Sequence, residues 1–308
     1  MLNATRLRVL REVVARGSFS AAADALSYSQ SAVSQAIATL EGEVGTKLIE
    51  RDRGGVLPTQ AGAALASHAD GILARMEAAE TEVAAISGGQ GGRLRVASFP
   101  TAGGTLLPRA IASLRASHPG VELTLAEDEP DRISPRLRAG EFDLALLFEF
   151  PGVGERLGAG LRRFELLEDP LHLALPATHR LARRRKVRLE DLREEPWVQT
   201  YATSPCARHV VRSCHAAGFE PRVSFESDDY QTVQGLVAAG VGVALIPQMA
   251  LSAVRPDIRI RALDPNSPVR RVFAAVRRGA AVTPAVATML DVLREVAGSG
   301  ERQATAAA

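Results

Sequence analysis

The sequence predicts a multidomain fold made of a small, mainly helical N-terminal domain, a long linking helix and a two-lobed α/β domain. Its 308 residues exceed the usual size of a single domain. A glycine-rich stretch at residues 88–92 marks a change in pattern, because helical periodicity dominates before it and strands alternate with helices after it. A seven-residue apolar repeat just before this stretch indicates the long helix.

Residues 2–45 predict three short helices. Ser18 is a suitable N-cap for the second helix and Gly45 a suitable C-cap for the third, with the turn-forming residues 27–30 between them. The apolar face of the first helix is expected to consist of Leu2, Leu7, Leu10, Val13 and Val14. The buried stripe of the third is expected to consist of Val33, Ala36, Ile37, Leu40 and Val44.

The opposite face of the third helix is unusual for a protein surface because it lacks Glu, Lys and Arg. It carries Ser31, Ser34, Gln35, Ala38 and Thr39. Short polar side chains let a helix approach the base edges in the major groove of DNA. On these residues alone, an alanine-rich helix pair without a nucleic-acid partner fits about as well.

Two short extended segments follow, at residues 47–51 and 56–57, and they flank a turn at residues 52–55. This pattern predicts a β-hairpin, or wing, beside the helix pair. Arg51 and Arg53 are placed to meet phosphates. The alternatives are a solvated surface arginine at either position and an internal ion pair for Arg51.

A long helix is predicted from Thr59, its N-cap, to about residue 87. Apolar residues repeat every seven positions along it in two offset series, as in a coiled coil. Nothing obvious precedes this helix for it to pack on, so we expect the apolar seam to pair two copies of the chain. The seam is expected to consist of Leu65, Ile72, Met76, Ala79, Val83 and Ile86.

The remaining chain predicts two α/β lobes, with a parallel sheet wrapped in helices. Strands are expected at residues 94–98, 121–126, 143–148, 164–167, 171–175, 197–199, 222–225, 241–246, 258–262 and 271–276. Helices are expected at residues 105–116, 131–139, 205–217, 230–239 and 283–297. The predicted domains are residues 1–58, 59–92 and 93–300, with lobe one at about 93–162 and 269–300 and lobe two at about 163–268.

Residues 8–62 resemble the N-terminal winged helix-turn-helix domain of the LysR-type transcriptional regulators. The positions that carry the resemblance are Gly17-Ser18-Phe19, Ala21-Ala22, Leu26, Ser34-Gln35, Leu40-Glu41, Gly45, Leu48, Arg51 and Thr59-x-x-Gly62. Ile49 departs from the family, which usually has Phe there, and Pro58 stiffens the exit from the wing. The α/β part resembles the same family's effector domain, which is similar to a small periplasmic solute-binding protein. That likeness lies in residues 106–108, 140–144 and 235–247.

The resemblance implies a sequence-specific, DNA-binding transcriptional regulator whose activity is modulated by a small-molecule effector bound between the lobes. Its double-stranded DNA site would be an interrupted inverted repeat. The chain would form dimers and further a tetramer, with RNA polymerase as another partner. The residues expected to contact DNA are Ser18, Ser31, Ser34, Gln35, Thr39, Arg51 and Arg53.

Ligands of such a fold lie in the crevice beyond the strand ends, between the lobes. The residues expected to bind the effector there are Ser98, Pro100, Thr101, Thr200, Tyr201, Thr203, Ser204, Ser227 and Asp228. Thr101 and Ser204 near helix starts suit an anionic ligand, whereas the acidic Asp228 favours a ligand that bears a donor or an amine. Each of these residues has an alternative role as a helix cap.

Enzymatic chemistry is not indicated, because the sequence has no phosphate loop, nucleophile elbow or distinctive carboxylate pair. No cofactor or metal is expected, since Cys206-x-x-His209 provides too few ligands for a stable site. Cys206 and Cys214 lie eight residues apart on one predicted helix, too far for a disulfide. The basic run at residues 180–188 is expected to be a solvated loop.

Neither an export signal nor a membrane span is apparent, so we expect a cytoplasmic protein. The longest apolar run, residues 233–246, contains three glycines and is too short to cross a bilayer. Three other functions stay open: a cytoplasmic solute-binding or enzymatic α/β protein with an incidental helix pair, a structural scaffold, and a thiol-redox-sensing regulator.

Overall fold

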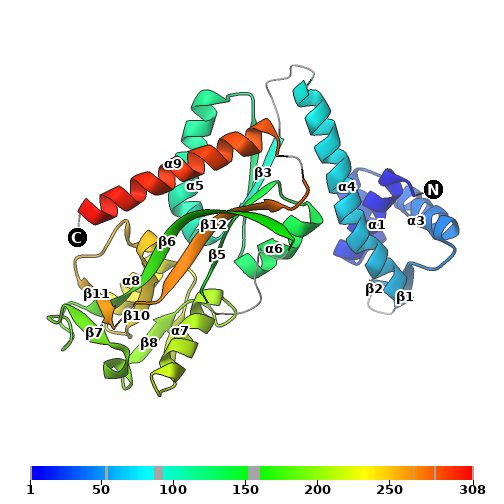
Figure 1. Cartoon of the computed structure of the whole chain (residues 1–308). Helices are drawn as coiled ribbons and strands as arrows, with labels where there is room; N and C mark the ends of the chain where they lie inside the picture. Colours follow the sequence, from blue (N-terminus) through cyan, green and yellow to red (C-terminus); the bar gives the residue numbers. More distant parts are fainter. Residues whose placement is uncertain are drawn as a thin grey trace. The chain divides into compact units, whose positions relative to one another are not determined.

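The computed structural model of the chain describes residues 2–52, 55–86, 93–151, 160–265, 267–280 and 282–306. They form two compact units: a mainly helical N-terminal unit, from residues 1–92 and 136–142, and an α/β C-terminal unit, from residues 93–135 and 143–308 (Figure 1). The predicted fold class is confirmed. The glycine-rich stretch at residues 88–92 lies outside the described residues. Within the described part, no helix combines the length and the apolar character that a membrane crossing needs.

The N-terminal unit contains the three predicted helices and the wing. The helices are α1 (Ala4–Arg16), α2 (Phe19–Leu26) and α3 (Gln30–Val44), and an antiparallel hairpin follows, made of β1 (Ile49–Asp52) and β2 (Gly55–Pro58). The side chains of Asn3, Ser18 and Ser29 accept backbone N–H groups at the three helix starts. Leu2 precedes α1 and is 42% exposed, so its expected place in the core is wrong.

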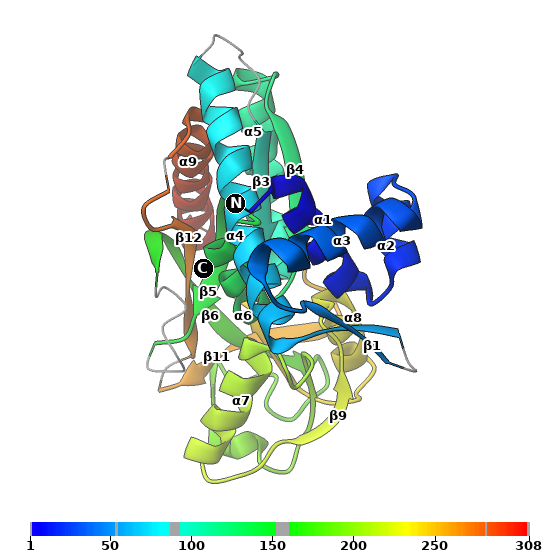
Figure 2. The ribbon, with the colours of Figure 1, turned by 90° about the vertical axis from the view of Figure 1, so that its right-hand side faces the viewer.

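One backbone conformation and one side chain set the orientation of α3 within its unit. Ser27 ends α2 with φ 54° and ψ 40°, a left-handed conformation that turns the chain sharply into α3. Glu41, near the end of α3, is buried, and its Oε1 accepts the backbone N–H groups of Leu48 (2.9 Å) and Ile49 (3.2 Å). These bonds attach the start of the wing to α3. Figure 2 shows the ribbon of α3 and of the hairpin that begins with β1.

The long helix α4 (Gln60–Ile86) begins at Thr59, whose hydroxyl accepts the N–H of Gly62 at 3.0 Å. Contrary to expectation, α4 has a partner within its own unit, because Ala66, Ala69 and Leu73 are buried and the helix packs on α1. Ala69 belongs to the predicted seven-residue repeat, whereas Ala66 and Leu73 lie one position after Leu65 and Ile72 and are outside it. Of the seam residues, Leu65 is half-buried beside the N-terminal core.

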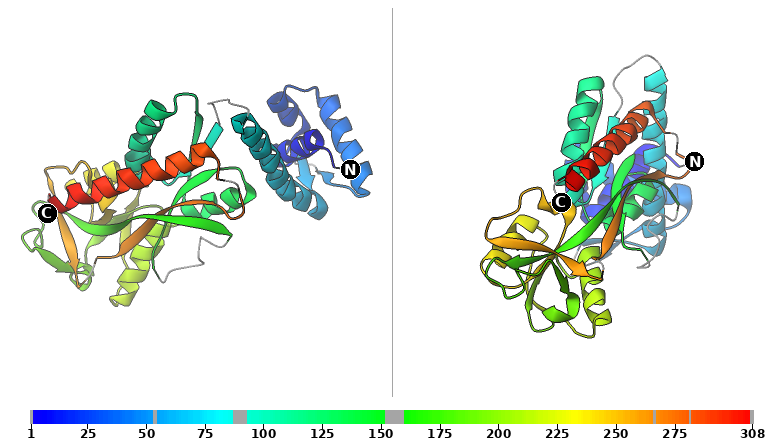
Figure 3. Two further views of the ribbon diagram at one scale, coloured as in Figure 1. Left: turned by 45° about the horizontal axis from the view of Figure 1, so that its top comes forward. Right: turned by 60° about the vertical axis from the view of Figure 1, so that its left-hand side comes forward.

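The C-terminal unit begins with a parallel three-stranded arrangement. Strands β3 (Arg93–Ser98), β4 (Glu122–Glu127) and β5 (Leu144–Glu149) lie in the order β4-β3-β5. They are connected by α5 (Pro100–Ser117) and α6 (Pro130–Ala139). The C-terminal helix α9 (Pro284–Ala306) packs along α5 (Figure 3). It runs nine residues beyond the predicted end at residue 297.

One long strand joins the two lobes. β6 (Leu161–Pro176) is continuous where the sequence predicts two strands, at residues 164–167 and 171–175. Its first part pairs antiparallel with β12 (Val269–Arg277), and its last part pairs with β10 (Ala244–Pro247) and β11 (Ile258–Asp264). The sheet is therefore mixed, whereas the alternation of strands and helices in the sequence predicts a parallel sheet.

The second lobe adds a small parallel pair, β8 (Pro196–Gln199) and β9 (Arg222–Glu226), with α7 (Pro205–Ala216) and α8 (Tyr230–Ala238). A short strand, β7 (Lys186–Arg188), pairs with β11 and was not predicted. Two 3-10 helices complete this lobe, η1 (Leu189–Leu192) and η2 (Gln248–Leu251). Trp197, the single tryptophan of the chain, is fully buried here.

Candidate nucleic-acid interface and ligand crevice

The uncharged face of α3 is accessible. Ser31, Gln35 and Thr39 are exposed, and Ser34 is half-buried. The Thr39 hydroxyl donates to the Gln35 carbonyl at 2.8 Å, and the Ser31 hydroxyl lies 3.0 Å from that of Ser29. The accessible face of α3 therefore presents one side-chain carboxamide and several short hydroxyl groups that could contact the base edges in a DNA groove.

The remaining predicted DNA contacts have different surroundings. The Ser18 hydroxyl accepts the N–H of Ala21 at 3.3 Å, so this residue acts first as the N-cap of α2. Arg51 lies in β1, but its side chain is outside the described residues, as is the whole of Arg53. The Glu41 carboxylate holds the start of β1, the strand that contains Arg51.

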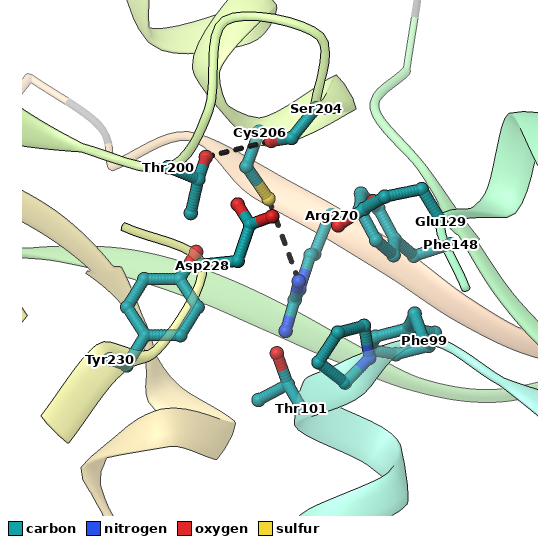
Figure 4. A pocket seen from close by; sticks show the side chains of 11 residues that line it. Phe99, Thr101, Glu129, Phe148, Thr200, Ser204, Cys206, Asp228, Tyr230 and Arg270 are labelled. Atoms are coloured by element: carbon teal, nitrogen blue, oxygen red, sulfur yellow. Dashed lines mark hydrogen bonds between the residues drawn. The ribbon is translucent and has the colours of Figure 1, made fainter. Parts of the chain in front are cut away.

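In the C-terminal unit, five of the predicted effector-binding residues meet in one crevice. Pro100, Thr101, Thr200, Ser204 and Asp228 line it. The crevice is also lined by Phe99, Glu129, Phe148, Cys206, Tyr230 and Arg270, which were not among the predicted effector-binding residues (Figure 4). The volume that the centre of a water molecule can occupy in this crevice is about 10 Å3, so in this conformation the crevice has room for about one water molecule.

The other four predicted residues lie beside the crevice rather than in its lining. Ser98 is buried, and its hydroxyl donates to the Phe99 carbonyl. The backbone N–H of Tyr201 donates to Asp228 at 3.0 Å, while its side chain is 52% exposed. The carbonyl of Thr203 accepts from Arg208, and the Ser227 hydroxyl accepts the N–H of Asp229.

Hydroxyl groups close one end of the crevice. The Thr200 and Ser204 hydroxyls are 2.7 Å apart, and that of Ser204 accepts the N–H of Ala207 at the start of α7. Ser204 is therefore both a helix cap and a lining residue, so the two interpretations of this position from sequence hold together.

A buried ion pair forms the floor. Arg270 is 1% exposed, and its Nε donates to Asp169 Oδ2 at 2.9 Å while Nη2 lies 2.8 Å from the same oxygen. Asp169 also accepts the N–H of Met249 at 2.9 Å, and Arg270 Nη1 points to Cys206 Sγ at 3.6 Å. The guanidinium carbon lies 5.0 and 4.6 Å from the ring centres of Phe99 and Phe148.

Sequence reasoning missed Arg270 because it stands next to Arg271 in a predicted strand and looks like a surface charge. The two-residue period of the strand does not distinguish the two arginines, because Val272 and Ala274 on one face and Phe273 and Ala275 on the other are all fully buried. A buried arginine requires a buried carboxylate, and Asp169 supplies it from a distant part of the sequence.

Glu129 is the second residue that sequence reasoning missed. Burial first, and then the negative charges of Asp228 and Asp131, raise its pKa from 4.5 to about 7, although the positive charge of Arg270 opposes the shift. Its Oε2 is enclosed and has no hydrogen-bond partner among the residues that the structure describes. This carboxyl group is therefore poised between its neutral and charged forms near neutral pH.

A wider groove adjoins the crevice and shares four lining residues with it: Pro100, Thr101, Asp228 and Tyr230. It offers about 510 Å3 to the centres of water molecules. Glu127, Asp228 and Asp229 contribute its charge, and no Lys, Arg or His is among the described residues that line it. The approach to the crevice is thus acidic.

The two cysteines are poorly placed for redox sensing. Both are buried and free, and they lie eight residues apart on α7, which corresponds to about 12 Å. A disulfide requires about 7 Å or less. Burial raises the pKa of both thiols, that of Cys214 to about 12, and so keeps them protonated and weakly nucleophilic.

The basic run is largely neutralised by carboxylates in the same lobe. Its ion pairs are Arg180–Glu195, Arg184–Asp191, Lys186–Asp264 and Arg188–Glu190. Exposed pairs of this kind contribute little to stability, and they leave little free positive charge for phosphates.

The chain is similar to known proteins over nearly its whole length. Residues 4–63 match the model of the bacterial regulatory helix-turn-helix protein, lysR family, and residues 87–298 match that of the LysR substrate binding domain. The chain is 35% identical to the probable HTH-type transcriptional regulator LrrA of Synechococcus elongatus, over 96% of this chain and 98% of that protein.

Two further comparisons agree. A probable hydrogen peroxide-inducible genes activator of Mycobacterium avium is 31% identical over 88% of this chain and 86% of its own. The crystal structure of full-length CbnR in complex with its target DNA has the same fold, with a TM-score of 0.66 at 23% identity, over 96% of this chain and 100% of that one.

Proposed function

The chain belongs to the LysR family of bacterial transcriptional regulators, and from this premise we propose how its residues bind DNA and a ligand. It is a DNA-binding transcriptional regulator with an effector-binding domain, and not an enzyme. Members of the family bind DNA and small-molecule effectors and form oligomers.

Residues 1–58 form the DNA-binding domain in this proposal, residues 59–92 the dimerising linker, and residues 93–300 the effector-binding domain. The exposed face of α3 enters the major groove, where Gln35 and Ser34 read base edges. Ser18, Ser31 and Thr39 contact the edges of the groove, and Arg51 and Arg53 of the wing contact phosphates. The absence of charge on the α3 face supports this arrangement.

The outer face of α4 pairs with a second copy. Ile72, Met76 and Val83 are 38%, 45% and 63% exposed, a run of large apolar side chains that favours burial in an interface. Leu65, Ala79 and Ile86 complete the seam. Two paired heads fit an interrupted inverted repeat, and the effector domains link dimers into a tetramer. RNA polymerase is the proposed downstream partner, in the cytoplasm, where the chromosome lies.

The effector occupies the crevice between the lobes. Thr101, Thr200, Ser204, Pro100 and Asp228 line it. Ser98, Tyr201, Thr203 and Ser227 extend the proposed binding site beside this lining. Because β6 runs through both lobes, a ligand that changes the angle between them transmits strain along a shared strand. The expected outcome is a change in the spacing of the heads on DNA.

The observation that carries the DNA assignment is the match of residues 4–63 to the family's DNA-binding domain, together with the open, uncharged face of α3. The test is fluorescence anisotropy of a labelled operator duplex with Gln35→Ala and Ser34→Ala. Each variant should lose about 1–3 kcal/mol against the specific site and little against unrelated DNA. Ser113→Ala, an exposed serine on α5, is the matched control and should bind as the wild type does. Unchanged affinity in both α3 variants would refute the reading helix.

A further inference from the structure

The crevice contains more negative than positive charge. Asp169 already neutralises Arg270 at 2.8 Å from below. Glu129 and Asp228 remain, and within the described part of the chain neither forms an ion pair with Lys, Arg or His. Figure 4 shows the two carboxylates on either side of the Arg270 side chain. A ligand that brings a positive charge would complete the site.

Two enclosed atoms that line the crevice also lack hydrogen-bond partners within the described part of the chain, and one is an acceptor while the other is a donor. Glu129 Oε2 is an acceptor without a donor. Arg270 Nη2 is a donor without an aligned acceptor, because its 2.8 Å approach to Asp169 Oδ2 lacks hydrogen-bond geometry and Nε already donates to that oxygen. Buried polar atoms without partners are rare in folded proteins, so each requires an explanation. One ligand that carries both a donor and an acceptor would satisfy them together.

A purely anionic ligand fits less well. The N-termini of α5 and α7 favour anions at the crevice, and each contributes about half a positive charge. Glu129 and Asp228 together contribute up to two full negative charges at the same place. The acidic groove adds Glu127 and Asp229, so an approaching anion is repelled and a cation is attracted.

We propose that this crevice binds a small ligand that carries a protonated amine next to an oxygen acceptor, as in an amino acid, an amino alcohol or an amino amide. The amine donates to Glu129 and Asp228, the oxygen accepts from Arg270 Nη2, and the rest of the ligand lies in the acidic groove. This inference rests on the proposed function, since it names the chemical class of the effector for the same site.

The binding of an amine draws a proton from Glu129. Burial is the main cause of its raised pKa of about 7, and the charged groups that face this carboxyl are Asp228, Asp131, Asp128 and Arg270. Without ligand the carboxyl is therefore about half protonated near pH 7. An added cation favours the carboxylate, so binding releases a proton. The fraction already ionised rises about tenfold between pH 6 and pH 8, and affinity should rise by about the same factor.

The test is isothermal titration calorimetry of the full-length protein with two matched pairs of probes. L-alanine is compared with lactate, and ethanolamine with ethylene glycol, because in each pair a hydroxyl replaces the amine. The amines should bind at least about tenfold more tightly than their partners. Titrations in two buffers of different ionisation enthalpy should show proton release at pH 7.

Variants locate the effect. Glu129→Gln keeps the shape of the side chain and should lower amine affinity about tenfold at pH 8 and abolish both the pH dependence and the proton release. Glu122→Gln removes an exposed carboxylate of β4 and should change nothing. Equal or tighter binding of lactate or ethylene glycol, or no binding by any probe at millimolar concentration, would overturn the proposal.

The DNA-binding assay on the same preparation distinguishes a failure of the proposed ligand class from a failure of the proposed DNA-binding function. Operator binding with no amine binding would refute the class of ligand and leave the regulator intact. Amine binding without operator binding would refute the DNA-binding function and leave the crevice assignment intact.

Discussion

Glu129→Gln should stabilise the effector-binding domain, and only above about pH 5. In the folded protein the pKa of Glu129 is raised from 4.5 to about 7, chiefly because burial penalises the charged form. Each pKa unit corresponds to about 1.4 kcal/mol, so ionised Glu129 costs the folded state about 3 kcal/mol. Glutamine has nearly the same shape and no charge, and it avoids this cost.

The sign follows from proton binding. Between pH 4.5 and about 7 the folded protein holds a proton on Glu129 that the unfolded chain has released. The free energy of unfolding of the wild type therefore falls, through this residue, as pH rises across that window, and it is constant above it. The variant lacks this slope, so its advantage is near zero below pH 4.5 and reaches about 2–3 kcal/mol at pH 8.

Trp197 makes the measurement selective. It is the only tryptophan in the chain and is fully buried in the C-terminal unit, so its fluorescence in urea reports on that unit alone. Unfolding curves at pH 5, 6, 7 and 8 would be compared for wild type, Glu129→Gln and the control Glu122→Gln. A pH-independent difference, or a variant less stable than wild type at pH 8, would refute the account of Glu129.

Two further substitutions test the N-terminal unit. Ile72→Asp places a charge in the proposed seam, so it should dissociate the dimer, as measured by light scattering, and lower operator affinity. The control Ser67→Asp, at another exposed position of α4, should do neither. An intact Ile72→Asp dimer would exclude the seam. Glu41→Ala removes the acceptor of two backbone N–H groups and should destabilise the N-terminal unit by about 2–4 kcal/mol. The control Glu43→Ala, at an exposed position of the same helix, should lower the stability far less. Similar losses of stability in both variants would exclude the anchoring role of Glu41.

The helices of the DNA-binding unit could be predicted because their signals are local. Ser18, Ser29 and Gly45 cap their own helices, and the apolar stripe of α3 is legible within fifteen residues. The packing of α4 on α1 was missed because Ala66 gives no contrast with the alanines around it, and because the seven-residue repeat that contains Ala69 was interpreted as a seam between two chains. In an alanine-rich helix, a packed face that consists largely of alanine cannot be distinguished by sequence from the exposed faces.

The crevice was predicted only in part, for a different reason. Thr101, Ser204 and Asp228 closely follow strands, and the ends of strands in such folds converge. Arg270 and Glu129 depend on partners distant in sequence: Asp169 lies 101 residues from Arg270. The pKa of Glu129 depends on burial and on Asp228, which only the folded chain brings near. Charge balance in a site is a tertiary property and cannot be read from periodicity.

The most direct test of the central claim is a selection from random double-stranded DNA with the purified full-length protein. The account predicts enrichment of one interrupted inverted repeat, bound with high affinity against unrelated competitor DNA and lost in Gln35→Ala. A selected pool with no common sequence, and binding that unrelated DNA competes away equally, would contradict the assignment of this chain as a sequence-specific regulator.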